Sequence, residues 1–229
     1  MPAWLTESRW TAAKCAVLIF FILFQAYLIF VKKHLVLDID AYPNTLPSPN
    51  VFSDYTIGQT FIADKDYLSK IEVMLGTHGR ENDKDVVFQL WEWVPEKNLV
   101  VQKKFNASTV QNNRYKAVEF TPQKQSRKKG YLFLFSSPES SPNNSICAWM
   151  NEEDIYRNGN FMLKGQTQEG DLVFRVYFKR PIAAELGRMV SHNSGIFGNG
   201  LFLTLSLIFF TAVQLFVLSK LLDLTFKLM

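Results

Sequence analysis

An uncharged apolar run from Cys15 to Val31 constrains this chain more than any other feature of its sequence. Lys14 precedes the run, and Lys32 and Lys33 follow it. A second apolar run extends from about Gly200 to Ser219. An apolar helix needs roughly 17–25 residues to cross the hydrocarbon core of a bilayer, and both runs are long enough. The sequence therefore predicts two membrane spans.

Each run has an alternative interpretation. A cleaved signal peptide has a shorter apolar region, of about 7–15 residues, and small residues before its cleavage site. The first run is longer and ends in Phe30-Val31-Lys32-Lys33-His34, so we expect a retained anchor. The second run could be a buried core helix, but its length and its content of leucine and phenylalanine favour a span.

The two spans divide the 229 residues into segments. Between the spans we expect a proline-containing extended connector, one domain long enough to bury a core, and a linker. The expected boundaries are 1–11 for the first tail, 12–33 for the first span, 34–55 for the connector, 56–180 for the domain, 181–197 for the linker, 198–220 for the second span and 221–229 for the last tail.

From Thr56 onward, apolar and polar residues alternate with a period of two, which is typical of half-buried strands. The segment from Tyr131 to Phe135 is apolar on both faces, which indicates a central, covered strand. A short helix is expected over 183–190. Strands are expected over residues 69–75, 86–93, 99–101, 116–121, 131–136, 145–150 and 171–178. This pattern predicts an all-β sandwich domain flanked by two transmembrane helices.

Several motifs of the expected domain resemble a recurrent bacterial β-domain. They are Gly58-Gln59-Thr60-Phe61, Leu68 with Ile71, Asp154-Ile155-Tyr156 up to Gly159, and Gly170-Asp171-Leu172-Val173-Phe174-Arg175-Val176. Over about residues 56–178 the chain is similar to the lectin-like or jelly-roll modules of membrane glycosyltransferases and surface-polysaccharide proteins. The motifs are mostly core and turn positions, so the resemblance implies a jelly-roll-like fold and a bacterial origin but identifies no glycan site.

The orientation of the spans follows only weakly from charge. Two spans place both termini on one side, and the basic residues on the two sides of the membrane nearly balance. These residues are Arg9, Lys14, Lys220 and Lys227 on the terminal side, and Lys32, Lys33, Arg180 and Arg188 on the domain side. From the lectin-like architecture we expect an extracytoplasmic domain and cytoplasmic termini at the bacterial inner (plasma) membrane.

The sequence carries no recognisable catalytic or metal-binding motif. Its histidines are scattered, without the spacing of a zinc site, and it has neither a nucleophile elbow nor a phosphate-binding loop. The acidic segments Asp64-Lys65-Asp66 and Glu152-Glu153-Asp154 are typical of turns. The net charge of +4 is spread along the chain, which does not indicate a nucleic-acid partner. We therefore expect no catalytic residue, no metal and no cofactor.

The strand expected over residues 86–93 suggests a surface for a ligand or a partner. If Val86 and Phe88 face the core, then Gln89, Trp91 and Trp93 face outward. Indole faces beside a hydrogen-bonding amide suit sugar rings or an anchor in a protein interface. The alternative is that another layer of the domain covers both indoles.

A basic run formed by Lys124, Arg127, Lys128 and Lys129 is a second candidate surface. It suits the headgroups of membrane lipids or an acidic polymer. The alternative is an ordinary solvated loop.

The spans contain small and polar residues that could mediate helix packing, namely Gly200, Thr204, Thr211 and Gln214 in the second span and Gln25 in the first. If the midpoints of the two spans are level, the two glutamines differ in depth by about 10 Å. Each amide is then expected to find another partner, or to be satisfied by backbone or simply tolerated.

Two functions remain. The leading hypothesis is a non-catalytic accessory subunit that packs against a larger integral-membrane complex through its spans and its sandwich. The alternative is a carbohydrate-binding membrane protein that acts in the assembly or export of surface polysaccharide.

Overall fold

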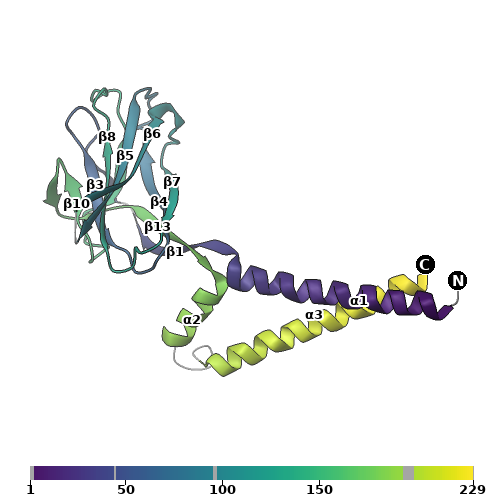
Figure 1. Cartoon of the computed structure of the whole chain (residues 1–229). Coiled ribbons are helices and arrows are strands. Elements are labelled where there is room, and N and C mark those ends of the chain that lie inside the picture. Colours follow the sequence, from purple (N-terminus) through teal and green to yellow (C-terminus); the bar gives the residue numbers. More distant parts are fainter. Residues whose placement is uncertain (1–2, 44, 95–96, 193–198, 229) are drawn as a thin grey trace. The chain divides into compact units, whose positions relative to one another are not determined.

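The computed structural model describes residues 3–43, 45–94, 97–192 and 199–228 (Figure 1). The chain separates into two units, which are described one at a time. The β unit contains residues Leu35–Lys179, and the helical unit contains Met1–His34 and Arg180–Met229. Parts of the expected tails, connector, domain, linker and second span, at residues 1–2, 44, 95–96, 193–198 and 229, lie outside the described residues.

Two antiparallel sheets form the β unit (Figure 1). Their longer strands are β1 (Lys33–Ala41), β3 (Ile57–Ile62), β4 (Leu68–Gly76), β5 (Asp85–Val94), β6 (Asn98–Asn106), β7 (Arg114–Gln123), β8 (Gly130–Ser136) and β13 (Phe174–Pro181). The shorter strands are β2 (Leu46–Pro47), β9 (Cys147–Asn151), β10 (Phe161–Leu163), β11 (Gln166–Gln168) and β12 (Asp171–Leu172).

The order of the longer strands is that of a jelly roll. In the first sheet, β13 pairs with β1 and β4, and β7 pairs with the other edge of β4. In the second sheet, the order is β3-β8-β5-β6, with β10 and β11 added beyond β3. The first and last long strands of the sandwich are therefore neighbours. The expected all-β sandwich flanked by two apolar helices is confirmed.

The alternation in the sequence identified the core correctly. Ile71, Val73 and Leu75 of β4 are buried, as are Leu172, Phe174, Val176 and Phe178 of the last segment. As expected from its apolar faces, β8 is a central strand, between β3 and β5. Phe174 joins the two sheets, because its ring centroid lies 6.1 Å from that of Phe61 and 5.5 Å from that of Phe133.

A buried polar network also ties the sheets together. The Gln59 side chain of β3 donates to Asp171 Oδ1 (2.6 Å) and accepts from the backbone N–H of Leu172 (2.9 Å). Asp171 Oδ2 accepts from the N–H of Tyr156 (2.8 Å). Burial raises the pKa of the Asp171 carboxyl, and these hydrogen bonds act in the opposite direction. Three of the motifs recognised in the sequence thus meet at one place and hold the fold together.

The beginning of the domain differs from the expectation. Residues 34–55 do not form a simple connector, because β1 covers Lys33–Ala41 and pairs with β13, and β2 pairs with β9. The β unit accordingly begins at Leu35 and not at residue 56. Ile39 and Ala41 are buried in the core, so β1 alternates like the other strands.

The helical unit contains α1 (Ala3–Ala26), the π-helical turn η1 (Tyr27–Val31), α2 (Ile182–His192) and α3 (Gly200–Leu228). Within these helices, the segments Ser8–Val31 and Gly200–Thr225 are long and apolar enough to cross a membrane. Most of their large apolar side chains are exposed in the isolated chain, so they need an apolar environment around them. Both helices extend further toward the chain ends than the expected spans do, and α2 confirms the short helix expected before the second span.

Candidate functional site

The outer faces of the two sheets differ in character. On the first sheet, Lys70 and Glu72 form an ion pair (2.8 Å), and the hydroxyl of Tyr177 donates to Glu72 (2.7 Å). Burial and this hydrogen bond raise the pKa of Tyr177 to about 12, so its phenol stays protonated at neutral pH. Beside them, the guanidinium of Arg175 lies 4.1 Å from the ring centroid of Tyr115. These polar side chains on the outer face of the first sheet are thus paired with one another.

The second sheet presents an apolar outer face. Phe88 and Leu90 of β5 are buried in the core, whereas Gln89, Trp91 and Trp93 lie on the opposite side. Trp93 is 39 % exposed, and Trp91 is partly buried. The expected assignment of the two faces of this strand is therefore confirmed.

A groove of about 220 Å³ lies on this face. We call it the tryptophan groove, and its lining residues are Thr56, Gln89, Trp91, Trp93, Lys97, Leu132, Leu134, Met162 and Gly165. The pairing of strands explains how it is built. Trp91 lies opposite Leu132 of β8, Gln89 lies opposite Leu134, and Met162 of β10 lies opposite Gly58 of β3.

Gly58 keeps the floor of the groove closely packed. A Cβ atom at this position would lie 2.5 Å from Leu134 Cδ2 and 2.3 Å from the carbonyl oxygen of Phe133. Only glycine therefore lets the Leu134 side chain lie across β3. Within the segment Gly58-Gln59-Thr60-Phe61, Gly58 therefore allows close packing on the outer face of the sheet.

Lys97 lies beside both indoles. Its Nζ is 5.0 Å from the ring centroid of Trp93 and 5.6 Å from that of Trp91, within the range of cation–π attraction. The indole N–H of Trp91 is buried and has no hydrogen-bond partner among the described residues. The Gln89 amide donates to Gln102 of β6 (3.0 Å). The groove therefore combines apolar walls with one ammonium group.

The two tryptophans of the groove were predicted from the sequence, but most of the other lining residues were not. Lys97 lies between the strands expected over 86–93 and 99–101, and Leu132 and Leu134 lie in the strand expected to be apolar on both faces. Met162 lies on β10, which was not expected. The triplet Phe161-Met162-Leu163 was the available signal for that strand.

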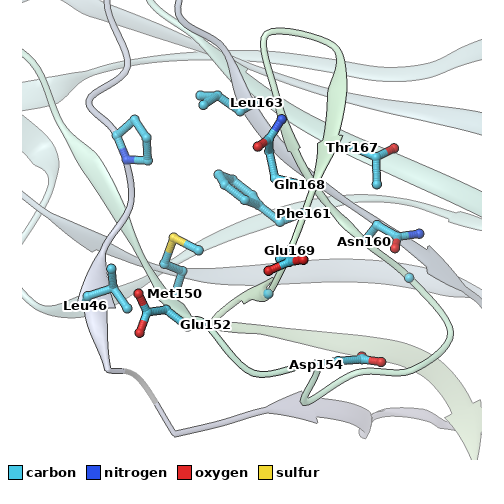
Figure 2. Close-up of a pocket in the computed structure, with 13 residues that line it drawn as sticks. Leu46, Met150, Glu152, Asp154, Asn160, Phe161, Leu163, Thr167, Gln168 and Glu169 are labelled. Carbon is cyan, nitrogen blue, oxygen red and sulfur yellow. The ribbon is translucent and has the colours of Figure 1, made fainter.

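A larger, open groove of about 1140 Å³ lies elsewhere on the β unit (Figure 2). Leu46, Met150 and Phe161 contribute apolar surface, and the carboxylates of Glu152, Asp154 and Glu169 lie around it. All three carboxylates are on exposed residues, as expected for a turn such as Glu152-Glu153-Asp154. The lining contains no basic side chain.

The described residues contain no group of three or more histidines, cysteines, aspartates or glutamates that could hold a metal ion. Cys147, the cysteine of the β unit, is buried, and burial raises the pKa of its thiol to about 11. It is therefore protonated at neutral pH and a poor nucleophile. Of the acidic turn at residues 64–66, Lys65 is buried in an ion pair with Asp38, and Asp66 accepts a hydrogen bond from the N–H of Arg127.

The basic run lies in the loop between β7 and β8. Lys124, Arg127 and Lys128 are exposed, whereas Lys129 forms an ion pair with Glu92 (2.8 Å). Its binding to lipid or to an acidic polymer stays a prediction.

The expectation for the intramembrane glutamines was wrong. Gln25 Nε2 donates directly to Gln214 Oε1 at 2.6 Å. The expected 10 Å mismatch rested on level midpoints of the two spans, and the observed contacts between α1 and α3 do not have level midpoints. Nearer the chain ends of α1 and α3, Lys14 Nζ contacts Asp223 Oδ1 at 2.6 Å. These two polar contacts shift the register by about two helical turns relative to level midpoints.

The other residues of the expected packing stripe make contacts within the chain. The hydroxyl of Thr204 donates to the carbonyl of Gly200 (2.7 Å), one turn earlier. A Cβ atom at Gly200 would lie 3.4 Å from Val190 of α2. Thr211 is partly buried, on the same side of α3 as Leu215 and Leu218. The stripe is thus used at least in part by the chain's own helices.

The sequence matches no family model, and no curated protein is similar enough to count as a relative.

The register of α1 and α3 can be tested by cross-linking. In a Cys15→Ser background, Phe21→Cys paired with Leu218→Cys should form a disulfide on mild oxidation, because the two polar contacts place these positions at one depth. Phe21→Cys paired with Thr211→Cys, which level midpoints would favour, should not. The products are separated by non-reducing electrophoresis, and the opposite result would contradict the register.

Proposed function

We propose that this chain is a non-catalytic, membrane-anchored accessory subunit, which docks onto a larger integral-membrane complex through the tryptophan groove. One observation carries the proposal: an apolar groove with two indoles lies on an outer sheet face, while the outer face of the other sheet is covered by its own ionic contacts. Tryptophan is enriched among the residues that dominate binding energy in protein interfaces.

The size and lining of the groove favour a protein partner. Its volume of about 220 Å³ lies below the roughly 300–1,000 Å³ of typical small-molecule sites. It is large enough for one or two apolar side chains. Lys97 adds a positive charge at the indoles, so we infer an apolar side chain of the partner with an acidic residue next to it.

The contact between Gln25 and Gln214 changes the role proposed for the spans. Because these amides bond each other, they are not available as unmatched groups that call for an outside helix. The exposed apolar sides of α1 and α3 would face lipid or the partner, and the sandwich would make the specific contact.

A carbohydrate-binding function in surface-polysaccharide assembly or export is the second candidate. The observation in its favour is the partly exposed Trp93, whose flat ring suits a sugar face, beside the Lys97 ammonium. Against it, the lining offers few hydrogen-bonding groups, and the Gln89 amide is already bonded to Gln102.

Replacing Trp91 and Trp93 with alanine in the full chain should release the partner while leaving the fold intact. Loss of one interface hot spot costs about 2 kcal/mol or more, which is roughly a thirtyfold loss of affinity. Co-purification from membranes measures the retained partner, and thermal unfolding measures stability. Trp149→Ala is the matched control, because this partly buried tryptophan lies on the first sheet.

Two outcomes would argue against the docking role. If the double variant unfolds, the indoles are core residues, whose loss costs about 3–5 kcal/mol each. If the partner stays bound but binding to surface polysaccharide is lost, the carbohydrate function replaces the subunit function.

We also propose that the sandwich is extracytoplasmic, in the inner membrane of a bacterium, with both termini in the cytoplasm. The lectin-like resemblance supports this orientation. A reporter enzyme that works only in the cytoplasm should be active when it is fused after Met229. A reporter enzyme that works only after export should be active when it is inserted at His78-Gly79, in an exposed loop. The reverse pattern would overturn the orientation.

A further inference from the structure

The helix α2 is amphipathic. Ile182, Leu186 and Val190 follow the spacing i, i+4, i+8 and share one side, whereas Arg188 and Ser191 lie on the other side. Ile182 remains 39 % exposed although it is a large apolar residue. An amphipathic helix that lies next to membrane spans and has a partly exposed apolar side is typical of helices in the bilayer surface.

Contacts within the helical unit place α2 at the ends of both apolar helices. It packs against η1, the last turn before Lys32 and Lys33. At its other end, Val190 packs against Gly200, the first residue of α3. The apolar segments therefore end at the level of α2, where the hydrocarbon core gives way to lipid headgroups.

Basic residues flank η1 and α2 along the chain. Lys32 and Lys33 follow η1, and Arg180 precedes α2. Glu185 is held between two of the basic side chains, with Arg180 Nη1 at 3.0 Å and Arg188 Nε at 3.3 Å. Residues 32–33 and 180–192 together contain four basic side chains and one carboxylate, so this part of the sequence carries a net positive charge.

We propose that α2 lies in the bilayer surface and that this basic collar, formed by Lys32, Lys33, Arg180 and Arg188, binds anionic phospholipid headgroups. Two observations support this assignment: α2 packs at the end of the first apolar helix with Ile182 exposed on its apolar side, and the excess positive charge is complementary to phospholipid phosphate. The proposal rests on the membrane anchoring put forward above, but not on the docking role of the tryptophan groove.

The depth of α2 can be measured in vesicles of phosphatidylcholine and phosphatidylglycerol that contain the full chain. In a Cys15→Ser background, bimane is attached to a single cysteine at Ile182, Ser191 or Ile19, while the native Cys147 is buried. Lipids brominated near their headgroups should quench the label at position 182 severalfold more than the label at 191. Lipids brominated deep in their chains should quench the label at 19 most.

Equal quenching at positions 182 and 191, with deep quenching at 19 retained, would overturn the proposal and leave the anchoring intact. Absence of quenching at position 19 would overturn the anchoring itself, and the proposal with it. The two failures are therefore distinguishable.

The headgroup preference has its own test. The triple variant Lys32→Gln, Lys33→Gln and Arg188→Gln should lose severalfold of the phosphatidylglycerol that remains on the purified wild-type chain, measured by lipid mass spectrometry relative to phosphatidylcholine. The matched control replaces three exposed basic residues of the β unit, Lys103, Arg114 and Arg157, with glutamine. An unchanged lipid ratio in the collar variant, or an equal loss in the control, would overturn the proposed headgroup binding.

Discussion

The pairing of β1 with β13 is the constraint on which the rest of the molecule depends. The first and last long strands of the sandwich are neighbours in one sheet, and each continues almost directly into a helical element. η1 ends at Val31, two residues before β1 begins at Lys33, and α2 begins at Ile182, directly after β13. The jelly-roll order therefore places the first and last long strands of the sandwich side by side in one sheet.

Within the helical unit, polar contacts determine the register of α1 against α3, which apolar contacts alone do not determine. Leucine and phenylalanine side chains make similar contacts at many depths, because lipid is as apolar as they are. The bond between Gln25 and Gln214 and the ion pair between Lys14 and Asp223 are each satisfied at one register only. Such contacts are worth about 0.6–2 kcal/mol each in a membrane, which is enough to choose between registers of equal apolar contact.

Local alternation made the core of the sandwich predictable, because a strand with one buried face repeats every two residues. It failed for β1, where prolines that follow the strand suggested a connector, and for β10, which is too short to show a period. The bond between the glutamines was missed for a different reason. The two spans were assumed to have level midpoints, whereas the bond between the glutamines and the ion pair of Lys14 with Asp223 hold α1 and α3 about two helical turns away from that register.

The tryptophan groove was also only partly predictable, because some of its residues lie on one strand and others come from distant parts of the sequence. The outward side of β5 was predictable from the alternation of Phe88, Gln89 and Leu90 alone. The groove also needs Met162, which arrives from a strand some seventy residues later, opposite the glycine at position 58 that leaves room for Leu134. Distant pairing of this kind cannot be read from a single sequence.

Photo-cross-linking in living cells tests the docking role of this face most directly. A photoreactive amino acid in place of Trp93 should yield one discrete adduct, identified by mass spectrometry as an integral-membrane protein. The same amino acid in place of Met74, on the outer face of the first sheet, should yield none. Equal adducts from both positions, or no adduct from position 93, would contradict the account.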